Sequence, residues 1–255
     1  MSDAPTFLVQ ITDPHLRTDD PSRLACLRAA VDRMLALGVL PTAVLVTGDI
    51  ADQGDPAEYA DAVTELDRVA APLVVIPGNK DDRAALRAAF QLPGEPTDRV
   101  QSVATIGGLR IIACDTQIPG EVPGDLDVDW LTDQLAADRV TPTVVAMHHP
   151  PYRIGVAALD AVGLPAEQRG ALDALLDDAP NVLRVVAGHV HRASFGVIGG
   201  VPASTSSSVS FQLALNLATG EMGVSDDPPA FAIHVLVDGD LVTHVHPIVP
   251  VGGAA

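Results

Sequence analysis

Six short apolar runs recur along the chain, and each stops immediately before an aspartate, a glycine or a histidine. The runs are five or six residues long and rich in valine, isoleucine and leucine. Runs of this length, bounded by polar or turn-forming residues, are typical of β-strands that are buried on both faces. We therefore predict six buried strands, at residues 7–12, 43–47, 73–77, 109–114, 143–147 and 182–187.

The segments between these runs have the periodicity of amphipathic helices. In residues 21–37, apolar side chains recur at three- and four-residue intervals, and Gly38 follows as a stop. Asp55 followed by Pro56 is a typical helix start with the aspartate as N-cap. Strands that alternate with helices predict βαβ units and a largely parallel sheet. Further helices are expected at about 81–90, 127–139 and 166–178.

The C-terminal part of the chain has a different pattern. Residues 193–215 and 230–248 contain short runs broken by glycine, proline and serine, with no clear helix. We expect them to form a second sheet, mixed or antiparallel, that packs on the first. Residues 212–227 are ambiguous. The simplest organisation is a single domain over residues 1–255, in which residues 193–255 complete the second sheet.

Composition and charge exclude several classes of protein. With 47% apolar residues, the chain of 255 residues can form a sizeable core and is not predicted to be disordered. The net charge of −18 disfavours long nucleic acids and anionic membranes as partners. No apolar stretch approaches the roughly 20 residues of a membrane span. The absence of a basic N-terminal region and the presence of only two cysteines predict a cytoplasmic location.

Five of the six runs lead directly into residues that bind metals. The sequences that follow them are DPH, GD, GNKD, HHPP and GHVH. Because the carboxyl ends of parallel strands share one edge of a sheet, we expect these side chains to converge. Imidazole and carboxylate groups suit first-row transition metals, and the clusters hold too many ligands for one tetrahedral ion. The sequence therefore predicts two ions that share one carboxylate.

The local spacing adds a geometric expectation. On an extended chain, the D-x-H and H-x-H patterns place both side chains on one face. His189 and His191 would then serve one ion, or adjacent ions if the chain turns there. Gly48, Gly78 and Gly188 each precede a candidate ligand, where glycine permits a sharp turn or a close approach.

Taken together, these motifs resemble the calcineurin-like metallophosphoesterase superfamily, and most closely its bacterial class III cyclic-nucleotide phosphodiesterase branch. The similarity extends to GDIADQGDPAEY, NKDDRAALR and GLRIIACDT, and it is strong over residues 6–195. The resemblance implies an α/β fold in which two mixed sheets form a four-layer αββα sandwich. It also implies a possible homodimer, which is common in this branch.

The resemblance also implies the metal ligands and the metals. The two ions would be iron with manganese or zinc, and His149 would lie behind the ligands. Asp13, His15 and His191 would hold the first ion, Asn79, His148 and His189 the second, and Asp49 would bridge both.

The chain departs from the family pattern at Lys80, where a histidine normally follows the asparagine. A lysine can stabilise charge that develops on the leaving oxygen, but with a reference pKa of about 10.4 it is a poor proton donor. Lys80 and Asp49 are our candidate catalytic residues, and the alternative for Lys80 is a position that has drifted in a weakened enzyme.

Several polar residues near the motifs have two interpretations. Asp82 is expected to cap a helix, whereas Asp52 and Asp81 are left open between capping and holding a ligand histidine. Arg83 and Arg192 could each meet a phosphate or form a surface ion pair. The late histidines are interpreted as surface or internally satisfied residues: His234, His244 and His246.

The predicted function is a metal-dependent phosphodiesterase that hydrolyses small phosphodiesters such as 3′,5′-cyclic AMP. A hydroxide bridging the two ions would attack phosphorus directly, without a covalent intermediate. One alternative is an esterase for other small phosphate esters, including 2′,3′-cyclic nucleotides, glycerophosphodiesters and phosphomonoesters. Another is a catalytically weak metal-binding scaffold, for which Lys80 is the only support in the sequence.

Overall fold

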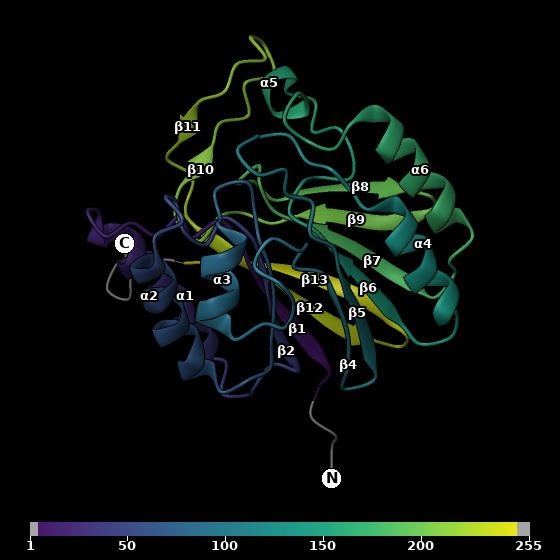
Figure 1. The fold of residues 1–255 in the computed structure, drawn as a ribbon, viewed down its shortest axis with the longest axis horizontal. Coiled ribbons are helices and arrows are strands. Elements are labelled where there is room, and N and C mark those ends of the chain that lie inside the picture. Colours follow the sequence, from purple (N-terminus) through teal and green to yellow (C-terminus); the bar gives the residue numbers. More distant parts are fainter. Residues whose placement is uncertain (1–4, 249–255) are drawn as a thin grey trace.

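The computed structural model, which describes residues 5–248, contains two large mixed sheets that pack face to face (Figure 1). Three helices cover the outer face of one sheet, and two helices cover the outer face of the other. The predicted four-layer αββα sandwich is confirmed. The expected domain limits at residues 1 and 255 lie outside the described residues. The helices are α1 (Pro21–Leu35), α2 (Pro56–Leu66), α3 (Arg83–Phe90), α4 (Val128–Ala137), α5 (Ala157–Asp160) and α6 (Ala166–Asp177), with a 3₁₀ turn at Asp67–Val69.

The first sheet has the strand order β13-β12-β1-β2-β3. Its first three strands along the chain are parallel to one another, and the last two are antiparallel additions at one side. The strands are β1 (Phe7–Ile11), β2 (Ala43–Thr47), β3 (Leu73–Ile76), β12 (Ala230–Val237) and β13 (Asp240–Pro247).

The second sheet has the order β4-β5-β6-β7-β9-β8. The four inner strands are parallel, and the two edge strands are antiparallel to their neighbours. The strands are β4 (Ser102–Ile106), β5 (Leu109–Ala113), β6 (Thr143–Ala146), β7 (Val182–Ala187), β8 (Ser194–Ile198) and β9 (Val201–Thr205).

Alternation along the strands explains why they are apolar throughout. In β2, Val44 and Val46 pack against α1 and α2, whereas Leu45 packs against the opposite sheet. In β5, Ile112 faces α4 and α6, and Ile111 faces the first sheet. Since successive side chains point to opposite faces, a strand between a helix layer and a second sheet must be apolar at every position. All six predicted strands form, within one residue of their expected ends.

The C-terminal residues do not form one sheet, contrary to expectation. β8 and β9 extend the sheet that contains β7, whereas β12 and β13 extend the sheet that contains β1. The pattern of apolar residues identifies a strand but does not show which sheet the strand joins. Here each of the two sheets accepts two of the C-terminal strands at one of its edges. Residues 212–227 form only a short pair, β10 (Gln212–Leu213) and β11 (Val224–Ser225), on an arm beside α5 (Figure 1).

Strand β4 was not anticipated, because its residues are largely exposed and lack an apolar run. The helix start at Asp55 is confirmed, since its side chain accepts from the N–H of Ala57 and Glu58 reaches back to Asp55. Among the helices of residues 5–248, none combines the length and the apolar character that a bilayer crossing requires.

Candidate metal centre

The loops that follow β1, β2, β3, β6 and β7 meet at one edge of the sandwich, three from one sheet and two from the other. The structure brings together all seven side chains that were predicted as ligands, in two groups joined by one carboxylate. Six of the seven are buried, and Asn79 is half-buried.

The first group consists of Asp13, His15 and His191. The Nε2 atoms of the two histidines are 3.0 Å apart, and Oδ1 of Asp13 lies 3.4 Å from Nε2 of His191. Oδ1 of Asp13 is buried and has no hydrogen-bond partner among the described residues. Because a buried carboxylate oxygen is normally paired, this unpartnered atom between two imidazoles fits a bound cation.

The second group consists of Asn79, His148 and His189. Nε2 of His148 lies 3.3 Å from Oδ1 of Asn79 and 3.2 Å from Nδ1 of His189. Two imidazole nitrogens and an amide oxygen thus face one another at distances that suit a shared first-row metal ion.

Asp49 lies between the two groups. Its Oδ2 atom is 3.5 Å from Nε2 of His15, and its Oδ1 atom is 3.6 Å from Nε2 of His148. The backbone N–H of Lys80 donates to the same Oδ1 at 2.8 Å. One carboxylate therefore presents an oxygen to each group, as two ions with a common ligand require.

The backbone of the ligands differs from the extended geometry that the spacing suggested. Five of them have left-handed φ angles: Asp13 (53°), His15 (48°), Asp49 (49°), His189 (69°) and His191 (49°). This conformation typically costs about 1–2 kcal/mol per residue outside glycine, and it is concentrated at functional sites. The turn separates His189 from His191, so the two histidines join different groups.

Hydrogen bonds to the outer ring nitrogens orient the histidines. Nδ1 of His148 donates to the carbonyl of Thr47 at 2.8 Å, and Nδ1 of His191 donates to the carbonyl of Phe211 at 2.8 Å. A neutral imidazole that donates from Nδ1 carries its lone pair on Nε2. Both Nε2 lone pairs consequently face the centre, as metal ligation demands.

Asp52 does the same for His15. Its Oδ1 atom accepts from Nδ1 of His15 at 2.8 Å, and its Oδ2 atom accepts from Arg17 at 2.9 Å. The hydrogen bond from His15 is the main cause that holds the pKa of Asp52 well below its usual range. Asp52, which the sequence left open, therefore orients a histidine and does not cap a helix.

His149 lies beside the second group, with a ring nitrogen within 4.8 Å of ring nitrogens of His148 and His189, but both of its own nitrogens have other partners. The hydroxyl of Thr116 donates to its Nδ1 at 2.8 Å, and its Nε2 donates to the carbonyl of Val122 at 3.0 Å. Its ring packs against those of His148 and His189, at centroid distances of 4.9 and 4.6 Å. With both nitrogens engaged, His149 has no lone pair left for an ion.

All three glycines that precede a candidate ligand are required by close approach, since a Cβ atom on Gly48 would lie 2.6 Å from Nδ1 of His148. A Cβ atom on Gly78 would lie 2.2 Å from Oδ1 of Asp49, and one on Gly188 would lie 1.9 Å from Oγ1 of Thr12. The side chains of Asp49 and Thr12 thus occupy the volume that a larger residue at either position would need. Lys80, directly after Asn79, has an exposed side chain at the same edge.

The structure assigns separate roles to the two aspartates that follow Lys80. Asp82 caps α3 by accepting from the N–H of Ala85, as expected. Asp81 instead lies buried and accepts from the backbone of Ile50, Ala51 and Gly78, which ties two ligand loops together.

Of the two rim arginines, Arg83 pairs with the fully buried Asp115 at 2.8 Å, which is neither of its expected roles. Arg192 forms the expected exposed pair with Asp227. Among the late histidines, His234 is buried and hydrogen-bonded to Gln10 and Thr243.

Sequence reasoning missed Asp115, Gln117 and Phe211. Asp115 and Gln117 follow the apolar run at residues 109–114, just as the candidate metal ligands follow the other runs. This placement in the sequence could have identified them. Phe211 had no comparable signal. Its ring packs against His191 at 4.4 Å and against His15 at 5.2 Å, which shields the first group.

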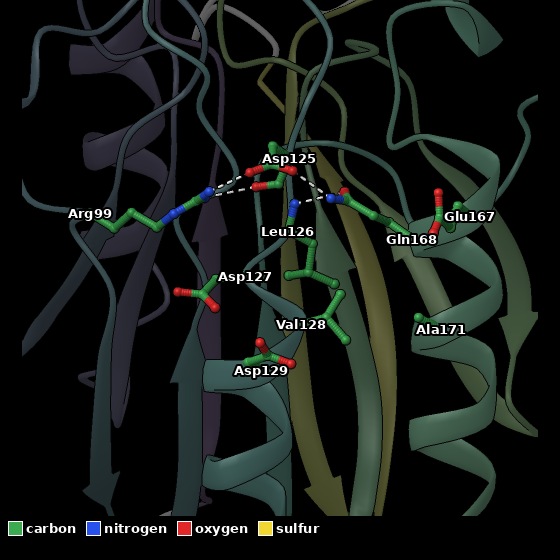
Figure 2. Close-up of a pocket in the computed structure, with 9 residues that line it drawn as sticks. All are labelled: Arg99, Asp125, Leu126, Asp127, Val128, Asp129, Glu167, Gln168 and Ala171. Atoms are coloured by element: carbon green, nitrogen blue, oxygen red, sulfur yellow. Dashed lines mark hydrogen bonds and ion pairs between the residues drawn. The ribbon is translucent and has the colours of Figure 1, made fainter.

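A separate cavity of about 630 Å³ opens at the N-terminal ends of α4 and α6 (Figure 2). Arg99 and Gln168 both contact the carboxylate of Asp125 there. None of the seven predicted ligands lines this cavity, and its central polar groups satisfy one another.

Comparisons with known proteins identify the family and the fold. The calcineurin-like phosphoesterase profile matches residues 8–193. A cAMP/cGMP dual specificity phosphodiesterase of Mycobacterium tuberculosis is 34% identical over 263 residues, which cover 96% of this chain and 80% of that protein. A glycerophosphodiester phosphodiesterase of Enterobacter lignolyticus is 31% identical over 198 residues, covering 72% and 70%. A dimetal phosphatase of Danio rerio has the same fold, with a TM-score of 0.73, 16% identity and coverage of 96% and 98%. The chain therefore belongs to the calcineurin-like phosphoesterase family.

Proposed function

We propose that the protein is a two-metal phosphodiesterase whose centre is organised by Asp49. The observation that carries this proposal is the position of its carboxylate, with one oxygen 3.5 Å from His15 and the other 3.6 Å from His148. Asp13 and His191 would complete the ligands of one ion. Asn79 and His189 would complete the ligands of the other.

The donor set favours iron together with manganese or zinc. Asp13 adds a carboxylate oxygen to the imidazoles of the first group, Asn79 adds an amide oxygen to those of the second, and neither group contains a thiolate, a combination that suits these borderline metals. When bound, two such ions would supply positive charge to the phosphate oxygens and lower the pKa of the attacking water.

The chain itself would contribute positioning and charge. The outer hydrogen bonds of His15, His148 and His191 hold their Nε2 lone pairs toward the centre and prevent ring rotation. Lys80 would place a flexible cation beside the leaving oxygen. Its backbone N–H on Asp49 couples its position to that of the bridging carboxylate.

We infer that the substrates are small phosphodiesters, with 3′,5′-cyclic AMP as the first candidate. The cAMP/cGMP specificity named for the Mycobacterium tuberculosis relative supports this substrate. The net charge of −18 opposes binding of long polyanions, while two cations at a local site still attract a small one. Glycerophosphodiesters are the second candidate, supported by the activity named for the Enterobacter lignolyticus relative.

The decisive experiment is hydrolysis by the purified protein with Mn²⁺ supplied and then chelated. Bis(p-nitrophenyl) phosphate reports phosphodiesterase chemistry, and 3′,5′-cyclic AMP and glycerophosphocholine are compared by kcat/KM. A higher kcat/KM for cyclic AMP supports the first candidate, and the reverse order supports the second. No metal-dependent turnover of any of the three would favour the scaffold alternative.

A homodimer and a cytoplasmic location remain proposals. The dimer is supported only by the family resemblance, and sedimentation velocity tests it. The location is supported by Cys26 and Cys114, which form no disulfide and so suit a reducing compartment. Fractionation of cells that express a tagged protein tests it.

A further inference from the structure

Gln117 lies behind the loop that carries Asn79 and Lys80, and its amide contacts both ends of that loop. Its Nε2 atom donates to the carbonyl of Gly78 at 2.8 Å and to the carbonyl of Asp81 at 2.5 Å. The side chain is buried, with 3% of its surface exposed. Both amide hydrogens are thus used on the two peptide groups that flank Asn79 and Lys80.

An ion pair between the buried Asp115 and the half-buried Arg83 holds Gln117 in turn. The carboxylate of Asp115 accepts from the N–H of Gln117 at 2.9 Å, and the guanidinium of Arg83 donates to the carbonyl of Gln117 at 2.8 Å. Arg83 also donates twice to Asp115, at 2.8 and 3.0 Å. Charge-assisted bonds in a buried place are strong, so the backbone of Gln117 is fixed on both sides.

The hydrogen bonds of Gln117 connect the two sheets beside the second group, whose members come from both sheets. Asn79 follows β3 in the first sheet, whereas His148 and His189 follow β6 and β7 in the second. Gln117 follows β5, in the same sheet as the two histidines. Its amide therefore links the loop that carries Asn79 to the sheet that carries the two histidines.

We propose that Gln117 is a positioning residue of the metal centre, which holds Asn79 in place opposite His148 and His189. This proposal rests on the metal assignment proposed above. Asp115 and Arg83 fix the backbone of Gln117 and therefore the position of its amide. The amide in turn holds the loop of Asn79 and Lys80 through the carbonyls of Gly78 and Asp81. Ligands placed by such outer partners lose affinity when the partner is removed, typically by about 10–100-fold.

The test is a calorimetric titration of metal-free protein with Mn²⁺, with electron paramagnetic resonance to detect the coupled ion pair. Gln117→Met keeps the length and removes both donors, and Gln117→Glu keeps the shape but turns a carboxylate toward two carbonyl oxygens. Affinity for the second Mn²⁺ should fall about tenfold in Gln117→Met and further in Gln117→Glu. Affinity at the group of Asp13, His15 and His191 should fall much less, since these three residues do not contact this network and only the shared Asp49 touches the loop, through the N–H of Lys80.

Gln101→Met is the matched control. Gln101 is half-buried, and its amide donates to the carboxylate of Asp127 at 3.1 Å, with no bond to the ligand loops. Its two Mn²⁺ affinities should equal those of the wild type. Thermal unfolding of each metal-free variant identifies general destabilisation, and Gln117→Asn, which keeps the donors on a shorter side chain, serves if Gln117→Met does not fold.

Two results would overturn the proposal. Wild-type affinity for both ions in a folded Gln117→Met variant would show that the amide does not position Asn79. Equal loss of both ions would show a general structural role. A wild-type protein that binds fewer than two Mn²⁺ would instead contradict the metal assignment itself, so the two failures are distinguishable.

Discussion

The backbone N–H of Lys80 donates a 2.8 Å hydrogen bond to Oδ1 of Asp49, the carboxylate that lies between the two histidine groups. The residue that departs from the family pattern therefore helps to orient the proposed bridging ligand through its main chain. Its side chain is free of that task and exposed at the same edge. Substitutions at Lys80 should for this reason leave the bridge intact and change only the chemistry of the side chain.

Asp49→Ala should release one or both metal ions and lower kcat by more than about 100-fold, because even outer partners of metal ligands are worth 10–100-fold. Metal content by plasma mass spectrometry after gel filtration checks this. Asp178→Ala, which removes an exposed carboxylate paired with Arg139 away from the centre, is the control. Full metal content and rate in Asp49→Ala would exclude the proposed bridge.

Asp52→Asn should weaken metal binding at the group of Asp13, His15 and His191 by about tenfold. The asparagine side chain lacks the negative charge that strengthens the hydrogen bond from Nδ1 of His15, so the imidazole ring is less firmly oriented. Mn²⁺ titration measures the effect, with the affinity at the other group as internal reference. Equal affinities in Asp52→Asn and the wild type would mean that His15 is oriented by packing alone.

Lys80→Met should lower kcat for cyclic AMP by about tenfold or more, and for p-nitrophenyl esters far less. The leaving group of cyclic AMP is an alkoxide, whose negative charge must be stabilised, whereas p-nitrophenolate already delocalises its charge. Lys80→His should restore part of the cyclic AMP rate and add a pH dependence near neutrality, because histidine titrates there. Arg153→Met, at a 71% exposed arginine, controls for the loss of a surface cation. An equal effect of Lys80→Met on both substrates would argue against a role at the leaving group.

Gly78→Ala should abolish activity and metal binding, because the new Cβ atom would lie 2.2 Å from Oδ1 of Asp49. Gly170→Ala in α6 has open space around it and should stabilise the protein by up to about 1 kcal/mol. Thermal unfolding and metal content of the two variants give the comparison. A Gly78→Ala protein that retains both metals would show that the loop can move aside.

His234 should make the protein less stable in mild acid. Burial lowers its pKa to about 3 in the folded state, against about 6.5 in the unfolded chain. Below pH 6.5 the unfolded chain binds a proton that the folded protein does not, so stability falls as the pH drops toward 3, by at most about 1.4 kcal/mol per pH unit. His234→Gln should lose less free energy of unfolding between pH 7 and pH 5 than His244→Gln, in which the exposed histidine is replaced. Parallel losses in the two variants would contradict this.

The sequence by itself determined the local elements and the chemical groups. Buried strands are apolar at every position, and each loop that carries a candidate ligand begins where an apolar run stops, so both could be read from the pattern of residues. The candidate ligands from Asp13 to His191 could be picked out because their types and their places after strands are local properties.

Only the tertiary structure decided how these elements meet. It divided the strands between two sheets and attached β12 to β1, because pairing of edges depends on contacts between residues more than 200 positions apart. Left-handed turns place His189 and His191 in different groups, the alternative that the spacing left open and that the family resemblance implied. Gln117 acquires its contacts only when the two sheets pack together, and no local pattern encodes a hydrogen bond across that gap.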